Sequence, residues 1–450
     1  MKRGDFGADF RWGAATSAFQ IEGATREDGR GPSIWDDFGR ARRRGWLGLG
    51  GKSGQASADV ACDHYHRYRE DVELLAALHV DAYRFSIAWP RLLPEGTGRV
   101  NRDGVDFYHR LLDSLAARGI TPFVTLYHWD LPLALERRGG WTNREVAQWF
   151  AEFAGLCARE YGDKVRHWIL LNEGLTFTGL GHFFGTHAPR RRRLRNFLPA
   201  LHHCLLAQAE AGRRIKERRP EALVGTAVAF AATHPLADRE RDRAAVRRVD
   251  ALGRAFVDPL VGRGYPVEEL PLLGQIERRV ARPGDQQRIR FPLDFLGINH
   301  YFRLTVRHSS FVPYLRAAPV TRADAERTAN GWEVHPPGIG EVLRGFGRYA
   351  EIPGLYVTEN GAAYDDVLGA DARVEDRDRA SYLQRYLAEV LAARRAGVAV
   401  RGYFVWSLLD NYEWDRGYEP RFGLVHVDRA TQRRTLKASG CWYRDFLAQP

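Results

Sequence analysis

The sequence contains little that would tie it to a membrane, a disulfide framework or a cysteine-bound metal. Its four cysteines lie far apart and form no Cys-x-x-Cys pair, so each is expected to be a small buried residue rather than a ligand or half of a disulfide. No run of about eighteen apolar residues could span a bilayer, and no apolar segment typical of a secretory signal follows Met1. These absences predict a cytoplasmic protein without a membrane partner.

Lysine is also scarce, and arginine supplies nearly all of the basic charge. The chain carries a formal net charge of +11, and residues 190–195, its densest basic segment, read RRRRLR. Such a run could bind phosphates, but no recognition-helix pattern, zinc-finger spacing or RNA-binding motif accompanies it. We interpret it as a solvated surface loop and expect no nucleic-acid partner, with nucleic-acid binding kept as the weaker alternative.

The composition is that of a globular enzyme, with 44% hydrophobic, 12% aromatic and 27% charged residues. Eight short apolar runs, rich in β-branched and aromatic residues, alternate with stretches of helical periodicity. The apolar runs are residues 10–15, 82–89, 121–129, 165–172, 223–230, 295–301, 355–358 and 400–408. The helical stretches include residues 69–78, 105–117, 145–161, 198–218 and 380–396.

This alternation predicts the fold. Continuous apolar runs between helices indicate parallel strands that are buried on both faces. Eight such units without a break in composition predict a single α/β domain over residues 1–450, a (β/α)8 TIM barrel. The chain is longer than the ~250 residues typical of that fold, so long βα loops are required. Candidate insertions are residues 29–57 and 309–340.

Polar and aromatic side chains follow the ends of five predicted strands. In a barrel these ends converge on the C-terminal face, where barrel enzymes hold their active sites. One polar residue after a strand is ordinary, whereas five strands ending in carboxylates, amides, imidazoles and indoles predict a site. The segments are Tyr127-His128-Trp129-Asp130, Asn172-Glu173, Asn299-His300-Tyr301, Thr358-Glu359-Asn360 and Trp406-Ser407.

Two carboxylates at such a site suit acetal chemistry. One carboxyl group protonates the leaving oxygen while the other attacks, or supports, an oxocarbenium-like centre. Glu173 and Glu359 follow the fourth and seventh strands, so the barrel mouth could place them on either side of a scissile bond. Retention requires about 5–5.5 Å between the carboxyl groups and inversion roughly 6.5–9.5 Å, and the sequence alone leaves that choice open.

Four motifs occur in order along nearly the whole chain. They are Phe10-Arg11-Trp12-Gly13-Ala14-Ala15-Thr16-Ser17 with Gln20-Ile21-Glu22-Gly23, Tyr83-Arg84-Phe85-Ser86-Ile87-Ala88-Trp89-Pro90-Arg91, Tyr356-Val357-Thr358-Glu359-Asn360-Gly361, and Trp406-Ser407-Leu408-Leu409-Asp410-Asn411-Tyr412-Glu413-Trp414. Together they resemble glycoside hydrolase family 1, the β-glucosidase family. The resemblance implies a retaining exo-β-glycosidase that acts on a small-molecule β-glycoside, most readily a β-glucoside, and needs neither a metal nor an organic cofactor.

The resemblance also implies roles for individual residues. Glu359 would be the nucleophile, with Arg84 and Tyr301 contacting its carboxylate, and Glu173 would be the general acid/base. Asn299 would support the carboxylate pair. The implied substrate-binding residues are Gln20, His128, Trp129, Asn172, Trp332, Trp406, Glu413 and Trp414.

Among the substrate-binding residues, the resemblance distinguishes several contacts. Asn172 would bond the sugar 2-hydroxyl, Trp406 would form a platform beneath the ring, and Trp332 would line the aglycone side. A carboxylate at Glu413 would repel a phosphate, which predicts an unphosphorylated glucoside. Galactosides and fucosides remain open alternatives.

The sequence departs from the family pattern around the expected acid. The family motif Thr-x-Asn-Glu-Pro is replaced by a segment with Leu170 in place of the threonine and Gly174 in place of the proline. Since proline fixes φ and glycine does not, we expect a segment after the fourth strand that is looser or takes a different path, and Gly174→Pro should raise thermal stability or leave it unchanged. His300 stands where the family usually has an aromatic residue, and we expect it to alter the aglycone side.

Two rival functions remain at this point. A transglycosylase would use an alcohol or sugar in place of water in the second step, and a non-catalytic barrel could bind sugars without turning them over. Gly174 is the feature that favours the second rival, whereas Glu173, Glu359, Arg84 and Tyr301 oppose it. The oligomeric state is left open.

Overall fold

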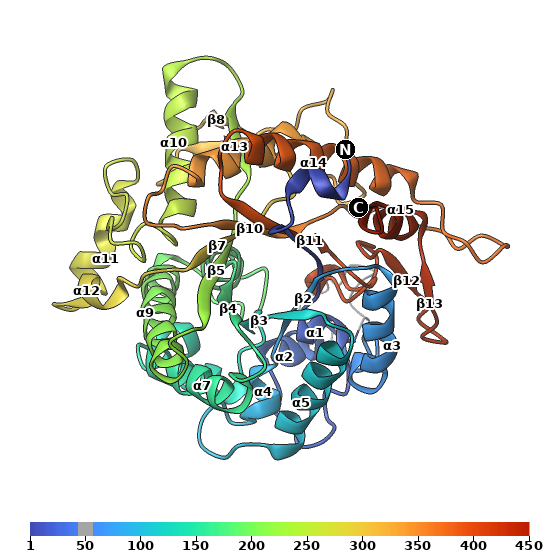
Figure 1. Cartoon of the computed structure of the whole chain (residues 1–450). Coiled ribbons are helices and arrows are strands. Elements are labelled where there is room, and N and C mark those ends of the chain that lie inside the picture. Colours follow the sequence, from blue (N-terminus) through green and yellow to red (C-terminus); the bar gives the residue numbers. More distant parts are fainter. Residues whose placement is uncertain (44–56, 450) are drawn as a thin grey trace.

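The computed structural model describes residues 1–43 and 57–449 and contains a closed barrel of eight parallel strands (Figure 1). The order around the barrel is β1-β11-β10-β7-β5-β4-β3-β2. Each predicted apolar run overlaps one of these strands, and β10 extends two residues beyond its run, so the predicted TIM barrel is confirmed. The barrel strands are β1 (Arg11–Ala15), β2 (Ala82–Ser86), β3 (Thr121–Tyr127), β4 (His167–Asn172), β5 (Leu223–Ala229), β7 (Phe295–Asn299), β10 (Leu355–Asn360) and β11 (Val400–Trp406).

Helices surround the strands, and the five predicted helical stretches fall within α3, α5, α7, α9 and α14 to within a residue or two (Figure 1). In α5 the buried residues include Val105, Tyr108, Leu112 and Leu115, a spacing that places them on one face of the helix. The helices are α1 (Ala18–Ile21), α2 (Ile34–Arg43), α3 (His64–Ala77), α4 (Trp89–Leu92), α5 (Arg102–Ala117), α6 (Leu133–Arg137), α7 (Val146–Tyr161), α8 (Gly174–Thr178), α9 (Leu194–Arg218), α10 (Glu240–Arg254), α11 (Gly274–Arg279), α12 (Asp285–Ile289), α13 (Pro337–Phe346), α14 (Arg377–Arg395) and α15 (Ala438–Leu447).

Side chains from every barrel strand fill its interior. The buried cluster there consists largely of alanines and large aromatic residues, and ring centroids of Phe123 lie 4.9 Å from Phe404 and 5.3 Å from Tyr356. This packing makes the barrel a solid core rather than a pore. The strand residues of the cluster are Ala15, Ala82, Phe123, Ile169, Ala227, Phe295, Tyr356, Phe404 and Trp406.

The long loops carry secondary structure of their own. A three-stranded sheet consists of β6 (Ala232–Pro235), β8 (Arg303–His308) and β9 (Ala317–Pro319), and α10 packs against it through Ala245 and Val306. A hairpin of β12 (Val425–Val427) and β13 (Arg434–Leu436) follows β11. The predicted insertion 309–340 contains β9 and the start of α13, and the insertion 29–57 contains α2, with residues 44–56 outside the described residues.

No helix within residues 1–43 and 57–449 is long and apolar enough to cross a membrane. This agrees with the sequence, in which no apolar run of that length occurs.

Candidate active site

The C-terminal ends of the barrel strands border a cavity of about 430 Å³. Most of the predicted site residues line it, and Gln20, Arg84 and Asn299 contact those that do. The lining residues are His128, Trp129, Asn172, Glu173, Thr176, Leu180, His187, Ala229, Tyr301, Phe302, Asn330, Trp332, Glu359, Trp406, Glu413, Trp414, Asp415, Arg416 and Phe422.

Glu359, on β10, is held at both carboxylate oxygens. Arg84 on β2 donates to Oε1 and also to the carbonyl of Thr358 at 3.0 Å. The hydroxyl of Tyr301 donates to Oε2 at 2.5 Å. Burial and the neighbouring charge of Glu359 raise the pKa of Tyr301 well above its ordinary value, so this phenol remains a donor. The carboxylate of Glu359 is therefore fixed in position by a cation and a hydroxyl.

Glu173 follows β4 with a left-handed backbone conformation, φ +54°, and its peptide N–H donates to Ala227 O at 2.8 Å. Its Oε1 accepts a hydrogen bond from Asn299 Nδ2 at 2.8 Å. Burial, followed by the negative charge of Glu359, raises the pKa of Glu173 to about 7. Glu173 can thus carry a proton near neutral pH and can also release it, which a general acid/base must do.

Asn172 and Asn299 connect the surroundings of the two glutamates. Arg84 Nη2 donates to Asn172 Oδ1 at 2.6 Å, and Asn299 Nδ2 donates to the same oxygen at 3.0 Å. The hydroxyl of Thr358 donates to Asn299 Oδ1 at 2.7 Å. One continuous set of hydrogen bonds thus joins Glu359, through Arg84 and the two amides, to Glu173.

His128 stands beside this set. Its Nε2 lies 3.1 Å from Asn172 Nδ2, and burial, with the positive charge of Arg84, lowers the pKa of His128 well below its ordinary value. The ring is therefore neutral and lies nearly parallel to Trp406, with centroids 5.8 Å apart. Trp129 donates its indole N–H to the carbonyl of Asn172 at 3.0 Å and packs on Trp414 at 4.5 Å between ring centroids.

Gln20 lies beside Glu413, which lines the cavity. Gln20 Nε2 donates to Asn411 Oδ1 at 3.0 Å and to Tyr412 O at 2.9 Å, and it lies 3.4 Å from Glu413 Oε2. Glu413 is half-buried, and desolvation together with the charge of Glu359 raises its pKa to about 8. A carboxyl group that gains and loses a proton near neutral pH can both donate to and accept from a sugar hydroxyl.

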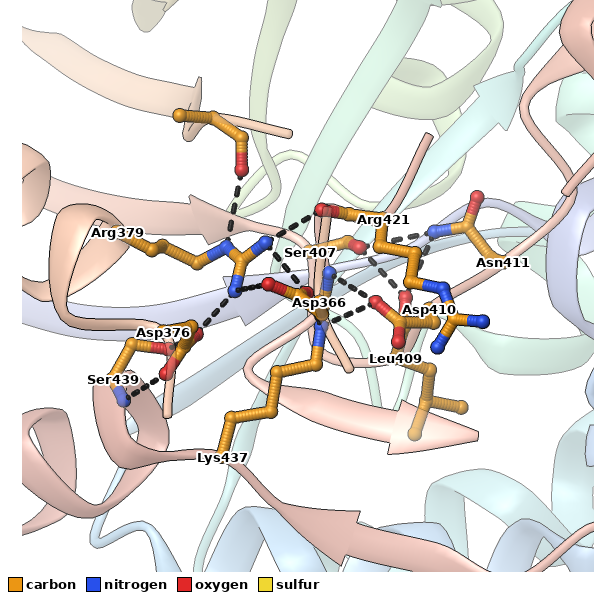
Figure 2. Close-up of polar contacts among 12 residues, drawn as sticks. Asp366, Asp376, Arg379, Ser407, Leu409, Asp410, Asn411, Arg421, Lys437 and Ser439 are labelled. Atoms are coloured by element: carbon orange, nitrogen blue, oxygen red, sulfur yellow. Dashed lines mark hydrogen bonds and ion pairs between the residues drawn. The ribbon is translucent and has the colours of Figure 1, made fainter. Parts of the chain in front are cut away.

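A buried ion-pair network lies beneath the segment that follows β11 (Figure 2). Lys437 donates to Asp410 Oδ1 at 2.6 Å and also pairs with Asp366, and Arg379 in turn pairs with Asp366 at 2.8 Å and with Asp376. Asp410 also accepts from the N–H of Gly423 at 2.9 Å. No sequence motif predicts this network, and the one signal for it is that Lys437 is among only five lysines in the chain.

Asn411 follows Asp410 directly and makes a separate set of buried contacts. Its Nδ2 donates to Ser407 Oγ and to Leu409 O, both at 3.0 Å (Figure 2). Its Oδ1 accepts from Gln20 at 3.0 Å. These buried polar contacts fix the backbone between Trp406 and Glu413.

The expected looser segment after β4 is wrong. Gly174 is buried and begins α8 directly after Glu173. A Cβ atom at this position would lie 2.5 Å from Cδ1 of Phe256 and 3.3 Å from the sulfur of Cys204. The lack of a side chain at Gly174 thus allows α8 to pack tightly against Phe256, two residues after the end of α10.

Two other expectations, about His300 and about the arginine run, also need correction. His300 is fully buried, and its Nδ1 bonds the carbonyl of Phe230 at 2.8 Å, so it does not line the cavity. The arginine run 190–195 is only partly solvated. Arg190 covers the ring of Phe38 and Arg191 pairs with Glu136, so neither reaches the catalytic cavity.

Comparisons with known proteins agree with this geometry. The sequence model described as Glycosyl hydrolase family 1 matches residues 2–449. The chain is 42% identical to β-glucosidase A of Thermotoga maritima, over 98% of this chain and 97% of that protein. It is 43% identical to thermostable β-glucosidase B of Thermobispora bispora, over 97% of this chain and 89% of that protein.

Solved structures give the same result. A family 1 β-glucosidase from Thermotoga maritima superposes with a TM-score of 0.92 at 42% identity, covering 98% of this chain and 97% of the other. The structure of the β-glucosidase from that organism in complex with deoxynojirimycin gives a TM-score of 0.91 at 42% identity, covering 98% and 97%. The match over nearly the whole sequence, together with the paired glutamates at the barrel mouth, leads to one conclusion: this chain belongs to glycosyl hydrolase family 1 and is a glycosidase.

Proposed function

We propose that the chain is a retaining exo-β-glucosidase, in which residues 1–450 act as one catalytic domain with Glu359 as nucleophile and Glu173 as general acid/base. One observation carries the assignment of roles. Glu359 is held by Arg84 and Tyr301, whereas Glu173 has an amide partner and a pKa raised to about 7. The two environments separate an ionised group from a protonated one, as double displacement requires.

In the first step a carboxylate oxygen of Glu359 attacks the anomeric carbon of the bound glucoside. The bond from that carbon to the aglycone oxygen breaks, and the proton of Glu173 passes to the departing oxygen. A covalent glucosyl ester on Glu359 results. Asn299, which donates to Glu173, is a positioning residue for this transfer.

The second step reverses the role of Glu173. Esterification removes the negative charge of Glu359, which is one cause of the raised pKa of Glu173. The ionised Glu173 accepts a proton from water, the water oxygen attacks the anomeric carbon, and the ester bond to Glu359 breaks. Glucose leaves with the configuration of the substrate, and both carboxyl groups return to their starting states.

The remaining residues would bind the terminal sugar. Asn172 would hold the 2-hydroxyl, and Gln20, His128, Trp129 and Glu413 would hold the other hydroxyls. Trp406 would lie beneath the ring, Trp414 would add a polar contact, and Trp332 would line the aglycone side. The ring of Trp332 lies 5.3 Å from that of Tyr301, consistent with a place at the outer edge of the reaction centre.

Glucose is the sugar we propose because relatives along the whole chain are named β-glucosidases. Two Thermotoga relatives at 40% identity are named 1,4-β-D-glucan glucohydrolase, which fits an enzyme that releases single glucose units. The preference for an unphosphorylated sugar and the cytoplasmic location remain predictions.

The test is hydrolysis of an aryl β-glucoside followed in real time by proton NMR. The proposal requires β-glucose to form first and to mutarotate later. The α anomer as first product would show inversion and would overturn the double displacement. Absence of turnover on aryl β-glucosides, β-galactosides and β-fucosides alike would overturn the proposal that the chain catalyses glycoside hydrolysis.

A further inference from the structure

A second cluster of ligand-type side chains lies outside the catalytic cavity. His234 is on β6, His335 lies two residues before α13, and Glu341 is on α13. Within residues 1–43 and 57–449 they form the one group of three His, Cys, Asp or Glu residues whose potential ligand atoms lie within 4.8 Å of one another. The sequence does not reveal this cluster, because His234 is about a hundred positions from its partners.

The geometry of the cluster is close to that of a metal site. His234 Nε2 lies 2.7 Å from Glu341 Oε2, and His335 Nε2 lies 3.8 Å from Glu341 Oε1. Ligand atoms about 2.0–2.1 Å from a tetrahedral zinc ion lie about 3.3 Å from each other, a separation between these two values. Small rotations of the three side chains would therefore admit an ion at their centre.

The state of His335 favours a ligand rather than a second ion pair. Its Nε2 is buried and has no hydrogen-bond partner among the described residues. A neutral imidazole nitrogen with a free lone pair is a preferred ligand of zinc and similar ions.

The cluster is reachable from solvent and firmly supported. Its side chains are 31%, 20% and 42% exposed in the order His234, His335 and Glu341. β6 pairs with β8, which fixes the backbone of His234, and the N–H of His335 donates to the hydroxyl of Tyr386 at 3.0 Å. Backbone contacts thus hold two of the three residues in place before any ion binds.

We propose that His234, His335 and Glu341 bind a divalent transition-metal ion, with Zn²⁺ as the best fit, and that water occupies the fourth coordination position. Two imidazoles and one carboxylate suit Zn²⁺ and disfavour Mg²⁺ and Ca²⁺, which require more oxygen ligands.

The site cross-links β6 to α13, two elements of different loops. His335 is three residues after Trp332, which lines the catalytic cavity. The ion would therefore stabilise the loop that carries Trp332 without contacting the reacting groups. We expect bound zinc to raise Tm and to leave turnover of a small aryl glucoside unchanged.

Isothermal titration of the chelator-treated full chain with zinc chloride tests the site. We expect one ion per chain with a dissociation constant below about 10 μM, and a Tm that rises with zinc concentration. Co²⁺ should give the strong visible absorption of a four-coordinate ion with nitrogen ligands. No heat of binding up to about 1 mM zinc would overturn the proposal.

Variants identify the ligands. Glu341→Gln keeps the shape of an exposed side chain, so it should fold normally and bind zinc at least about tenfold more weakly, and His335→Gln should weaken binding further. The matched control is His66→Gln. Both nitrogens of His66 contact carboxylates, Asp63 at 2.6 Å and Glu27 at 3.0 Å, yet we expect its loss to leave zinc binding unchanged.

The opposite pattern would sink the proposal. If His66→Gln abolishes binding while Glu341→Gln and His335→Gln bind as wild type does, the ion is elsewhere. Equal Tm values of all variants in chelator would show that the comparison is not distorted by misfolding. The cobalt spectrum of the wild type tests the nitrogen ligands independently of any substitution.

Discussion

The catalytic mouth and the network around Lys437 both bury carboxylates, but they pair them differently. At the mouth Arg84 pairs with Glu359, whereas Glu173 and Glu413 have no ion pair among the described residues. In the network two cations, Arg379 and Lys437, contact three aspartates (Figure 2). The three aspartates are Asp366, Asp376 and Asp410.

This difference separates two uses of buried charge. A carboxyl group that is buried without a cation keeps a raised pKa and can exchange a proton near neutral pH, as Glu173 does. A carboxylate enclosed by cations and N–H donors stays ionised and fixes the backbone around it. The carboxyl groups at the mouth lower the stability of the fold but can take part in proton transfer. The ion-paired carboxylates of the network stabilise the backbone around them.

Substitution of Glu359 should have the largest effect on activity. Glu359→Gln keeps the contacts with Arg84 and Tyr301 in shape but removes the nucleophile, so we expect kcat/KM to fall about 10⁴-fold or more. Aryl glucoside hydrolysis measures this. Glu359→Gly with added azide should form α-glucosyl azide, because the anion attacks from the face that the carboxylate occupied. A Glu359→Gln enzyme within tenfold of wild type would remove Glu359 from the mechanism.

Substitutions in the Lys437 network should lower the free energy of unfolding rather than the catalytic rate. Lys437→Met leaves Asp366 and Asp410 buried without this partner, and we expect the free energy of unfolding to fall by about 3–5 kcal/mol. Urea denaturation measures the change. Lys164→Met is the matched control, because Lys164 pairs with Asp113 at an exposed site and should cost at most about 1 kcal/mol. Equal losses in both variants would erase the contrast between the two regions.

At the mouth, removing a carboxyl group should stabilise the protein. The pKa of Glu173 is raised from 4.5 to about 7, so the folded state holds a proton that the unfolded state releases in this pH range. Below pH 4.5 both states are protonated and Glu173→Gln changes little. Between pH 4.5 and 7 the stability of the variant over wild type grows, and it reaches about 1–3 kcal/mol above pH 7.

Denaturation of Glu173→Gln across that pH range tests the sign. Asp366→Asn in the network is the counterpart, and it should lose stability at neutral pH because it breaks contacts with Arg379 and Lys437. A Glu173→Gln variant that is less stable than wild type at pH 8 would contradict the view that the mouth is a destabilised region.

Packing, rather than ion pairing, holds the backbone of Glu173. Proline is suited to the first turn of a helix such as α8, but the Cβ of Gly174→Pro would lie 2.5 Å from Phe256. We therefore expect the free energy of unfolding to fall by about 1–3 kcal/mol. The control Gly179→Ala has its nearest contact at 4.0 Å and should be nearly neutral. If Phe256→Ala restores the stability of Gly174→Pro, the clash with Phe256 is the cause.

The case of Gly174 shows where sequence reasoning stops. Each βα unit of the barrel contributes an apolar strand and a helix. This alternation recurs eight times along the chain, and five of the strands end in polar or aromatic side chains, so the pattern can be detected in a single sequence. The partner of Gly174 is Phe256, which lies on another βα unit, and no local pattern connects them. The same holds for Lys437 with Asp366, and for His234 with His335.

The roles of Glu173 and Glu359 could be expected from their motifs, but their electrostatic states could not. Those states depend on burial and on distances between strands far apart in the sequence. Glu413 illustrates this, because its motif does not show that desolvation and the charge of Glu359 raise the pKa of its carboxyl group to about 8.

The smallest effect should come from Asn299, whose hydrogen bond lowers the pKa of Glu173 against the effects of burial and of Glu359. Asn299→Ala removes this donor, so the proton of Glu173 is held more firmly. We expect the fall of kcat/KM at alkaline pH to move upward by about one pH unit or less. A general loss of packing would lower kcat/KM at every pH without moving the profile, so the position of its alkaline limb distinguishes a positioning residue from a structural one.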